Sequence, residues 1–460
     1  MKKKTDMLSG NAIKSIIVFA LPIMFSSLLQ YNYALVDNII VGRYVSTDAL
    51  AAVGNVGAIN SFIIGAALGL TSGFTIPVAH AFGAGDKRMV AHYSGSSIVV
   101  AFLVGTVIVV TAHLLSTPLL NLIGTPKEII KLSSAYVNIL YFGVPFQMLS
   151  NNFTAISRAV GESRKPLYFF MVSVFVNFCL DMLFVKTFGW GVEGAAAATL
   201  ISHITAASLT GFYIFKLNDD VQITKEDLKF HPKTALKQIG LGIPVSLQFT
   251  ITSVGSMCLQ SAVNSFGPNV IAGFTAASRV ENLTNLPMSA LGVATQTFVG
   301  QNYGAKNYDR IVKSVKKVFL LDLGVSVAMS IILFVISKPM VSLFMTSPND
   351  AMIAAANRYI LATCQCYSLV AVLFVLRNTL QGLGFTYANM VAGAGELAGR
   401  ILIAFVFTPL IGFTAVCYAA PAAWLLADIP LAIIYLSKHR KFKKLAAESI
   451  PQNSTLNSQN

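Results

Sequence analysis

Apolar residues run through this 460-residue chain in long blocks, separated by short polar stretches. A membrane-spanning helix needs about 20 consecutive, mostly apolar residues, and blocks of that length recur from one end of the sequence to the other. Their approximate bounds are 14–40, 53–78, 94–115, 133–157, 166–187, 193–215, 238–264, 274–299, 316–337, 353–381, 388–408 and 413–436. The pattern predicts an all-α membrane protein with twelve transmembrane helices.

Composition agrees with this prediction, because hydrophobic residues make up 55% of the chain, charged residues 11%, and the mean hydropathy is +0.68. Ordinary soluble domains do not reach such values. The apolar block behind the N-terminal lysines is too long for a signal peptide and has no cleavage site of small residues, so we expect a retained first span.

The net charge of +14 raises the question of a nucleic-acid partner. In the twelve-span arrangement, however, 24 of the 33 lysines and arginines fall on one face of the membrane. Such a bias marks the cytoplasmic face. We therefore expect the lipid bilayer and not nucleic acid as partner, a location in the cytoplasmic (inner) membrane of the cell, and both termini in the cytoplasm.

The longest polar interior stretch, residues 216–237, divides the twelve blocks six and six. The predicted domains are an N-terminal six-helix lobe (1–215), a cytoplasmic linker (216–237), a C-terminal six-helix lobe (238–436) and a basic, then polar, cytoplasmic tail (437–460). An even number of spans gives both lobes the same orientation. The substrate path is expected between them.

Short motifs of the first half return in the second at an offset near 222 residues, which indicates an internal duplication. The matched pairs are Leu21-Pro22-Ile23 with Ile243-Pro244-Val245, Leu50-Ala51-Ala52 with Ile271-Ala272-Gly273, Ala67-Leu68-Gly69 with Ala290-Leu291-Gly292, and Gly83-Ala84 with Gly304-Ala305. The last pair lacks the ending of a phosphate-binding loop and is interpreted as two helix-breaking turns. Gly65, Gly69 and Gly73 recur every fourth residue, a spacing that predicts close helix packing.

The first apolar block combines a proline, Pro22, with a carboxylate, Asp37, fifteen residues later. At about 1.5 Å per residue the two lie roughly 22 Å apart along a helix, so the acid falls inside the membrane if the proline lies near one face. An intramembrane acid is costly and marks ion or proton pathways. The alternative that remains open is an acid at a helix end, hydrated among the lipid headgroups.

These features together resemble the multidrug and toxic compound extrusion (MATE) family over almost the whole chain. The resemblance rests on the helix with Pro22 and Asp37, the Leu50-Ala51-Ala52-Val53-Gly54 stretch, the two Gly-Ala turns, Val299-Gly300-Gln301-Asn302 and the six-plus-six repeat. It implies a V-shaped pair of six-helix lobes that exchanges H⁺ or Na⁺ for cationic amphiphilic drugs, and hence a role in antibiotic resistance. No cofactor besides the coupling ion, and a monomer, are expected.

One bacterial branch of that family carries its ion site in the N-terminal lobe, and the resemblance places this site on five residues. They are Asp37, Asn177, Asp181, Thr199 and Tyr33. Asn177 and Asp181 are spaced i, i+4 and share a helix face. The oxygen atoms of Asp37, Asn177, Asp181 and Thr199 suit Na⁺, and the two carboxylates can also share a proton. Pro22 is the predicted hinge. Pairing of Asp181 with Lys186 remains the structural alternative.

The C-terminal lobe departs from another branch of the family, in which acids on the seventh and tenth helices couple the cation. Neither block carries a carboxylate here. Glu396 and Arg400, spaced i, i+4, are predicted to form an internal ion pair. Together with Gln30, Asn152 and Gln248 they are candidates for the substrate path.

Four further charged residues lie in or near apolar blocks. Arg279 and Glu281 are expected to reach the membrane interface from the start of the eighth span. Asp322 is expected to pair with Lys316 or Lys317 at the cytoplasmic edge. The sequence offers no partner for Asp428.

Two other functions are compatible with a polytopic membrane protein. A lipid-linked sugar flippase of the same superfamily would line its cavity with basic residues, yet only Arg377 and Arg400 lie deep in spans. A membrane-embedded enzyme would need converging histidines or cysteines, and His203 is the one histidine well inside a span. The sequence therefore favours a transporter that is not an enzyme. It does not specify the drug spectrum, the physiological substrate or the choice between H⁺ and Na⁺.

Overall fold

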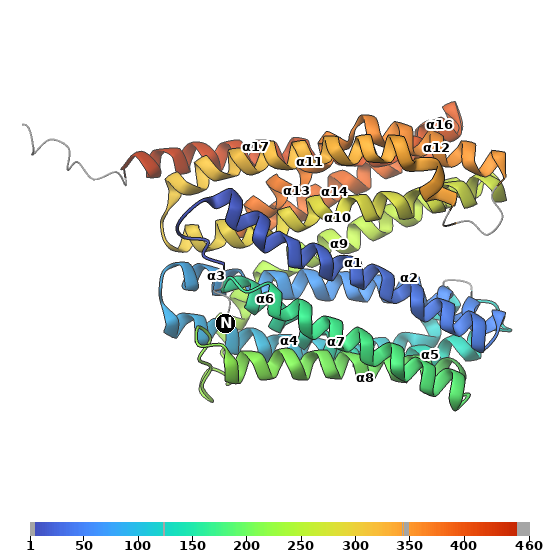
Figure 1. Cartoon of the computed structure of the whole chain (residues 1–460), viewed down its shortest axis with the longest axis horizontal. Coiled ribbons are helices and arrows are strands. Elements are labelled where there is room, and N and C mark those ends of the chain that lie inside the picture. Colours follow the sequence, from blue (N-terminus) through green and yellow to red (C-terminus); the bar gives the residue numbers. More distant parts are fainter. Residues whose placement is uncertain (1–4, 123–124, 343, 345–348, 449–460) are drawn as a thin grey trace, which may run out of the picture. The chain divides into compact units, whose positions relative to one another are not determined.

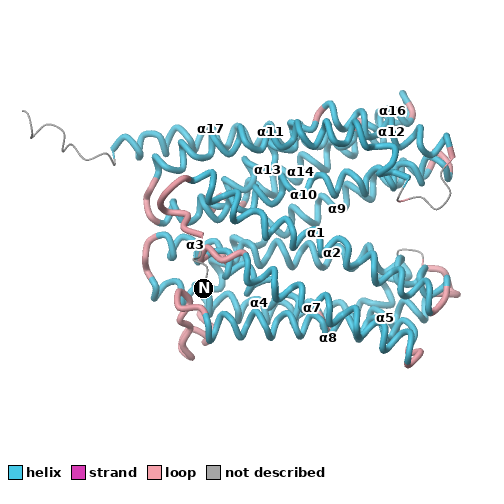
Figure 2. The backbone as a smooth tube through the Cα atoms, viewed as in Figure 1, coloured by secondary structure: helices cyan, strands magenta, loops and turns pink. Residues whose placement is uncertain are grey.

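The computed structural model describes the chain except for residues 1–4, 123–124, 343, 345–348 and 449–460. The polar end of the predicted tail, with its Asn-Ser-Thr sequence at Asn453, lies outside the described residues. Within the described part the regular elements are helices, and no strand occurs there (Figures 1 and 2). The all-α prediction is confirmed.

The helices of the first half and the one that follows the linker have the following bounds. They are α1 (Ala12–Tyr44), α2 (Thr47–Phe74), α3 (Ile76–Gly83), α4 (Lys87–Leu122), α5 (Ile130–Tyr141), α6 (Val144–Ala159), α7 (Arg164–Asp181), η1 (Met182–Thr187), α8 (Gly191–Phe212), η2 (Tyr213–Leu217) and α9 (Pro232–Asn264). The three elements labelled η, including η3 below, are π-helical turns.

The remaining helices make up the rest of the second half. They are α10 (Pro268–Gly304), α11 (Tyr308–Ser342), α12 (Asp350–Gln365), α13 (Tyr367–Gly382), α14 (Tyr387–Ile401), η3 (Leu402–Phe407), α15 (Thr408–Ile411), α16 (Phe413–Cys417) and α17 (Ala419–Glu448).

Each of the twelve predicted spans falls on a helix or on consecutive helices. Within the described ranges, nine helices are long and apolar enough to cross a membrane, and the pair α12 and α13, bent by 56°, makes a tenth. The other two predicted spans fall on α5 with α6 and on α10. The chain is a multi-pass membrane protein.

The chain forms two compact units. The first comprises residues 1–5, 18–82 and 86–250, and the second residues 6–17, 83–85 and 251–460. The boundary runs through α9, between Thr250 and Ile251. The predicted domains instead divide the chain at the linker, where the two repeated halves join. That division stays a prediction.

The glycine spacing of α2 serves close helix packing in the first unit. A Cβ atom at Gly73 would lie 2.4 Å from the Cα atom of Gly242 on α9, and one at Gly69 would lie 2.5 Å from the Cα atom of Ser246. Backbones this close leave no room for a side chain. The packing role predicted for these glycines is confirmed.

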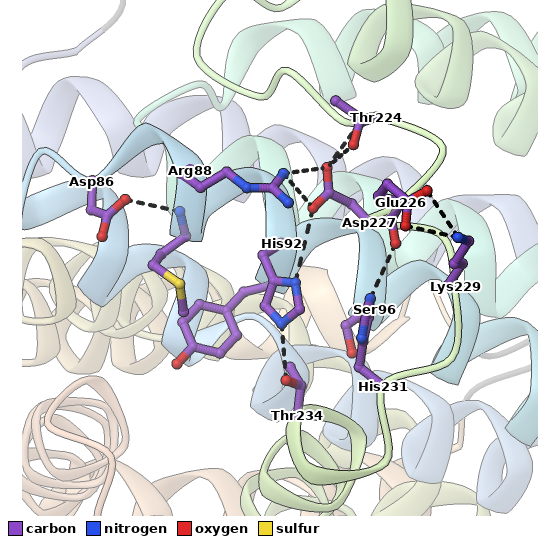
Figure 3. Close-up of polar contacts among 12 residues, drawn as sticks. Asp86, Arg88, His92, Ser96, Thr224, Glu226, Asp227, Lys229, His231 and Thr234 are labelled. Carbon is purple, nitrogen blue, oxygen red and sulfur yellow. Dashed lines mark hydrogen bonds and ion pairs between the residues drawn. The ribbon is translucent and has the colours of Figure 1, made fainter.

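The linker is tied to the start of α4 by a buried carboxylate, as Figure 3 shows. Asp227 is fully buried and accepts hydrogen bonds from Arg88 Nη1 at 2.8 and 3.0 Å. It also accepts bonds from the backbone N–H and the hydroxyl of Thr224, at 2.9 and 2.6 Å. Burial acts to raise the pKa of Asp227, but these bonds and the Arg88 charge outweigh it and hold that pKa below its usual value.

Left-handed backbone positions follow the repeat. The turn after α3 has Gly85 at φ +74°, and the equivalent turn after α10 has Lys306 at φ 60°. Gly161 at φ 84° is likewise matched by Gly384 at φ 88°. The offsets of 221 and 223 residues agree with the sequence motifs, so the duplication extends to the local conformation of the chain.

Candidate functional site

An acidic cluster inside the first unit joins α1 to α7 through Asn177. With the Asn177 amide oriented so that each of its atoms meets a complementary partner, its nitrogen donates hydrogen bonds to Asp37 Oδ1 at 3.0 Å and to Asp181 Oδ2 at 3.2 Å. Its amide oxygen accepts a bond from the Tyr33 hydroxyl at 3.2 Å. Asn177 and Asp181 are each 1% exposed, and Asp37 is half-buried. The cluster therefore holds two carboxylates largely away from water.

Helix α8 is the third helix that contributes residues to this cluster, after α1 and α7. Thr199 is buried beside Asp37, and Ser202, one turn later, lies 3.2 Å from the Tyr33 hydroxyl. The structure thus brings together all five residues predicted for the ion site.

Two oxygen atoms of the cluster are left over. Asp181 Oδ1 and Thr199 Oγ1 are buried and make no hydrogen bond of normal geometry among the described residues, although both side chains lie next to Asp37. Orphaned buried polar atoms are uncommon in folded proteins. Oxygen atoms of carboxylates and hydroxyls are what a hard cation such as Na⁺ accepts as ligands, and the same carboxylates can hold a proton. The donor set fits either ion.

Local chain geometry accounts for this arrangement. The i, i+4 spacing stacks Asn177 and Asp181 on one face of α7, and the π-helical turn η1 begins directly after Asp181. Such turns occur often at functional sites. Lys186, on that turn, lies with its Nζ 5.4 Å from the ring centroid of Tyr44. The alternative pairing of Lys186 with Asp181 is absent from the ion pairs of the described residues.

The predicted hinge residue Pro22 is buried within the continuous helix α1. Its carbonyl accepts a hydrogen bond from the Ser26 hydroxyl at 2.9 Å. Proline has no N–H to donate to residue 18, so the helix lacks one backbone bond at this point.

The second unit contains a different polar network, centred on Glu396 of α14. Arg377, on α13, donates a hydrogen bond to Glu396 Oε1, while Arg400 Nη2 lies 3.9 Å from Oε2. The Thr252 hydroxyl donates to Oε2 at 3.3 Å, and the Thr252 carbonyl accepts a bond from Arg400 at 2.9 Å. The predicted pair of Glu396 and Arg400 is therefore present, but Arg377 is the nearer partner.

Two predictions for acidic residues of the second unit are wrong. Glu281 does not reach the interface, because its carboxylate accepts a bond from the Tyr359 hydroxyl at 2.7 Å and lies within electrostatic reach of Arg400. Asp322 is fully buried on α11, and neither carboxylate oxygen has a hydrogen-bond partner in the described part of the chain. Asp322 lies among the packed helices of the second unit, whereas Lys316 and Lys317 are exposed.

The remaining candidates for the substrate path are not brought together by any described contact. Gln30 is exposed on α1, and Gln248 is buried on α9. Asn152 is fully buried on α6 and donates to the Ser97 hydroxyl at 3.0 Å. Their role in a substrate path stays a prediction.

Sequence reasoning missed three residues of these clusters. Ser202 follows Thr199 by three positions, a helical spacing that was available as a signal. Tyr136, buried on α5 and close to both Asp37 and Asp181, has no such signal. Arg377 was placed inside a span, but the sequence alone does not show which helix face it shares with Glu396.

Comparison with known proteins also indicates a membrane transporter. The model of the MatE family matches residues 22–183 and 244–410. The probable multidrug resistance protein YoeA of Bacillus subtilis is 29% identical over 378 residues, which are 81% of each chain. The probable multidrug resistance protein NorM of Thermotoga maritima is 26% identical and covers 85% of each chain. The multidrug export protein MepA of Staphylococcus aureus is 24% identical over 440 residues, 93% of this chain and 94% of its own.

Solved structures with the same fold are also found. A MATE protein in the bent conformation superposes with a TM-score of 0.89 at 23% identity, over 97% of this chain and all of the other. A MATE protein in the straight conformation gives a TM-score of 0.85 at 21% identity. These likenesses concern the fold.

Proposed function

The chain belongs to the MatE family of membrane transporters, and from that premise we propose that it exports cationic amphiphilic compounds in exchange for inward-moving H⁺ or Na⁺. It is a multidrug transporter and not an enzyme. What we propose beyond the family is the coupling ion and the class of drug.

One observation carries the choice of an ion-coupled mechanism. Asp37 and Asp181 come from different helices and meet at the amide of Asn177, with Asp181 Oδ1 and Thr199 Oγ1 beside them and without a hydrogen bond of normal geometry among the described residues. Two like charges in a poorly hydrated site repel each other, so a bound proton or cation stabilises the cluster. These contacts support a binding place in the first unit for the ion that the exchange requires.

Binding of that ion has to change the affinity for the drug. A ligand shifts a conformational equilibrium only by its difference in affinity for the two states, so drug and ion must prefer different states. Asp37 lies on the same helix as Pro22, where a backbone hydrogen bond is missing. We propose that neutralisation of the cluster bends α1 at Pro22 and lowers the affinity for the drug, and that release of the ion to the cytoplasm resets the protein.

Dye efflux into inverted membrane vesicles tests this proposal. A proton gradient and a sodium gradient are applied separately to the wild-type protein, to Asp37→Asn and to Asp219→Asn, an exposed linker residue that receives the same substitution. We expect efflux driven by one of the two gradients in the wild type and the control, and its loss in Asp37→Asn.

Dye binding to the purified proteins accompanies the transport assay. Asn is neutral and nearly isosteric with Asp, so Asp37→Asn should fold and still bind the dye. Undiminished efflux by Asp37→Asn at equal expression would refute the role of the cluster. Efflux that neither gradient drives would refute ion coupling altogether.

A further inference from the structure

Asp428, on α17 of the second unit, is a buried carboxylate with no hydrogen-bond partner. It is 6% exposed, and neither Oδ1 nor Oδ2 has a partner among the described residues. Carboxylates removed from water are normally paired or hydrogen-bonded, because the ionised form is costly in an apolar setting. The state of this carboxylate therefore requires an explanation that the packing of α17 does not supply.

Its charged neighbours are the members of the Glu396 network. Asp428 lies within electrostatic reach of Arg377 on α13 and of Glu396 on α14. Arg377 is already hydrogen-bonded to Glu396, which also faces Arg400 at 3.9 Å. The cation within electrostatic reach of Asp428 is thus engaged by another acid.

Charge counting within this network leaves one negative charge in excess. Arg400 links the Glu396 network to Glu281, so the connected groups comprise three carboxylates, Glu281, Glu396 and Asp428, and two guanidinium groups, Arg377 and Arg400. Glu281 accepts a bond from Tyr359, and Glu396 accepts bonds from Arg377 and Thr252. The ionised form of both glutamates is therefore supported by donors, and that of Asp428 is not.

The backbone of α17 is weakened beside this acid. Pro430 lies inside the helix two residues after Asp428 and cannot donate to the carbonyl of Leu426. Helix α14 makes its close approach at the same place, since a Cβ atom at Gly395 would lie 2.4 Å from Leu426 O. Gly395 precedes Glu396. A change of charge at Asp428 thus acts where α17 lacks one backbone bond and touches α14.

The charged clusters of the two units lie at equivalent positions of the sequence repeat. In the first unit the π-helical turn η1 begins one residue after Asp181, and in the second η3 begins two residues after Arg400. The helices that carry them, α7 and α14, begin at equivalent positions of the repeat. The polar cluster of the second unit therefore occupies the segment that corresponds to the ion cluster of the first.

We propose that Asp428 is a second proton-binding site, which takes up one proton to complete the charge balance of the Glu396 network and releases it when the second unit changes conformation. A proton is favoured over Na⁺ because it satisfies a lone carboxylate directly, whereas a metal ion needs several oxygen ligands. A buried acid outside this network, also on a helix packed against α17, is Asp322 of α11. It serves as the reference for a buried carboxylate outside the network.

Infrared difference spectroscopy of the purified protein tests the proposal without any transport assay. Isotopically labelled aspartate separates the carbonyl band of protonated aspartic acid from that of glutamic acid. All proteins carry Asp37→Asn and Asp181→Asn, so that the first unit adds no such band. Spectra taken on the weakly acidic and on the alkaline side of neutrality are compared for this parent, for Asp428→Asn and for Asp322→Asn as the matched control.

We expect the parent to show a protonated aspartic acid band with a component that disappears on the alkaline side. That component is retained in Asp322→Asn and lost in Asp428→Asn, where Asp322 is still present. If Asp428→Asn does not fold, the titration of the band in Asp322→Asn still decides, because Asp181 is already replaced and Asp428 is then the one buried aspartate left without a hydrogen-bond partner among the described residues. A band that Asp428→Asn leaves unchanged, one that never titrates, or one that responds to sodium and not to pH would each overturn the proposal. Because no drug enters the experiment, its result is independent of whether efflux is driven as proposed.

Discussion

Arg377 of α13 donates its hydrogen bond to the carboxylate of Glu396 on α14, across two helices that are separated in the chain by a turn. Arg400, on the same helix as Glu396, lies at 3.9 Å from the other carboxylate oxygen. All three side chains are nearly buried. Glu396 therefore holds two cations at once, and the two contacts differ in strength.

Removal of this carboxylate should be costly. Glu396→Gln removes the carboxylate that pairs with both guanidinium groups, and breaking a buried ion pair from one side costs about 3–5 kcal/mol. We expect Arg377→Gln to destabilise more than Arg400→Gln, since Arg400 keeps its bond to the Thr252 carbonyl. The melting temperature of the purified variants measures the difference.

The exchange of Glu396 and Arg400 provides the control. If these two residues formed an isolated pair, Glu396→Arg combined with Arg400→Glu would restore folded protein. Because an arginine at position 396 would meet Arg377, we expect no restoration. Recovery of well-folded protein in the double variant would show that Arg377 is not the principal partner.

The helices were predictable because each long apolar block has one stable solution in a membrane, a helix that satisfies its own backbone. The ion cluster was predictable because Asn177 and Asp181 are spaced within one helix and the family resemblance added Asp37, Thr199 and Tyr33. Tyr136 was not, because its contact depends on how α5 packs.

The acids of the second unit show where sequence reasoning fails. Asp322 and Glu281 lie in apolar blocks, near lysines or near the predicted start of a span, and hydropathy is the same whichever face of the helix they occupy. The direction in which their side chains point depends on the rotation of α10 and α11, which packing between helices determines. Arg377 and Glu396 likewise meet only because α13 and α14 fold against each other.

The linker contact predicts a response to acid. Asp227 has a lowered pKa in the folded protein, so it stabilises the docked linker at all pH values above the usual carboxyl pKa of about 3.9. That stabilisation is lost as the pH falls below this value toward the lowered pKa of the folded state. We expect the linker to resist limited proteolysis at neutral pH and to become susceptible below about pH 4.

Substitutions of Asp227 and of Arg88 should distinguish the contribution of the buried Thr224 hydrogen bonds from that of the exposed arginine. Asp227→Ala removes the acceptor of the Thr224 bonds and should expose the linker to protease at neutral pH, at a cost of about 1–3 kcal/mol. Arg88 is 64% exposed, so Arg88→Ala should cost less than about 1 kcal/mol. Equal susceptibility of the two variants would contradict the role assigned to the Thr224 bonds.

The orientation of the chain gives a prediction that depends on charge alone. Since the predicted twelve-span arrangement puts 24 of the 33 basic residues on one face, a reporter fused after residue 437 and one inserted near Asp219 should both report the cytoplasm. Alkaline phosphatase and green fluorescent protein fusions give opposite signals on the two sides of the membrane. A signal from the outer side at either position would contradict the twelve-span arrangement.

Asn177 is expected to matter for coupling and less for folding. Asn177→Ala removes the amide that separates and bridges Asp37 and Asp181, and the loss of hydrogen bonds to buried groups costs about 1–3 kcal/mol. The variant should express, melt a few degrees lower and lose most gradient-driven efflux. Asn138→Ala, a half-buried asparagine on α5, is the control for an asparagine outside the cluster. Equal efflux by the two variants would exclude Asn177 from coupling.

Pro22 tests whether α1 has to bend. Alanine at this position restores the backbone bond to Val18 and is favoured over proline by about 3 kcal/mol in a helix interior. If half of that difference raises the barrier to bending, transport should slow about tenfold while drug binding changes little. Stopped-flow efflux and equilibrium dye binding separate the two effects. Pro118→Ala, at an exposed proline inside α4, is the matched control and should transport at the wild-type rate.

Asp37 lies fifteen residues after Pro22 and, at about 100° per residue, faces within roughly 60° of it, so a bend at Pro22 displaces the acid relative to Asp181. Wild-type rates in Pro22→Ala would mean that the ion cluster acts on the drug without bending this helix.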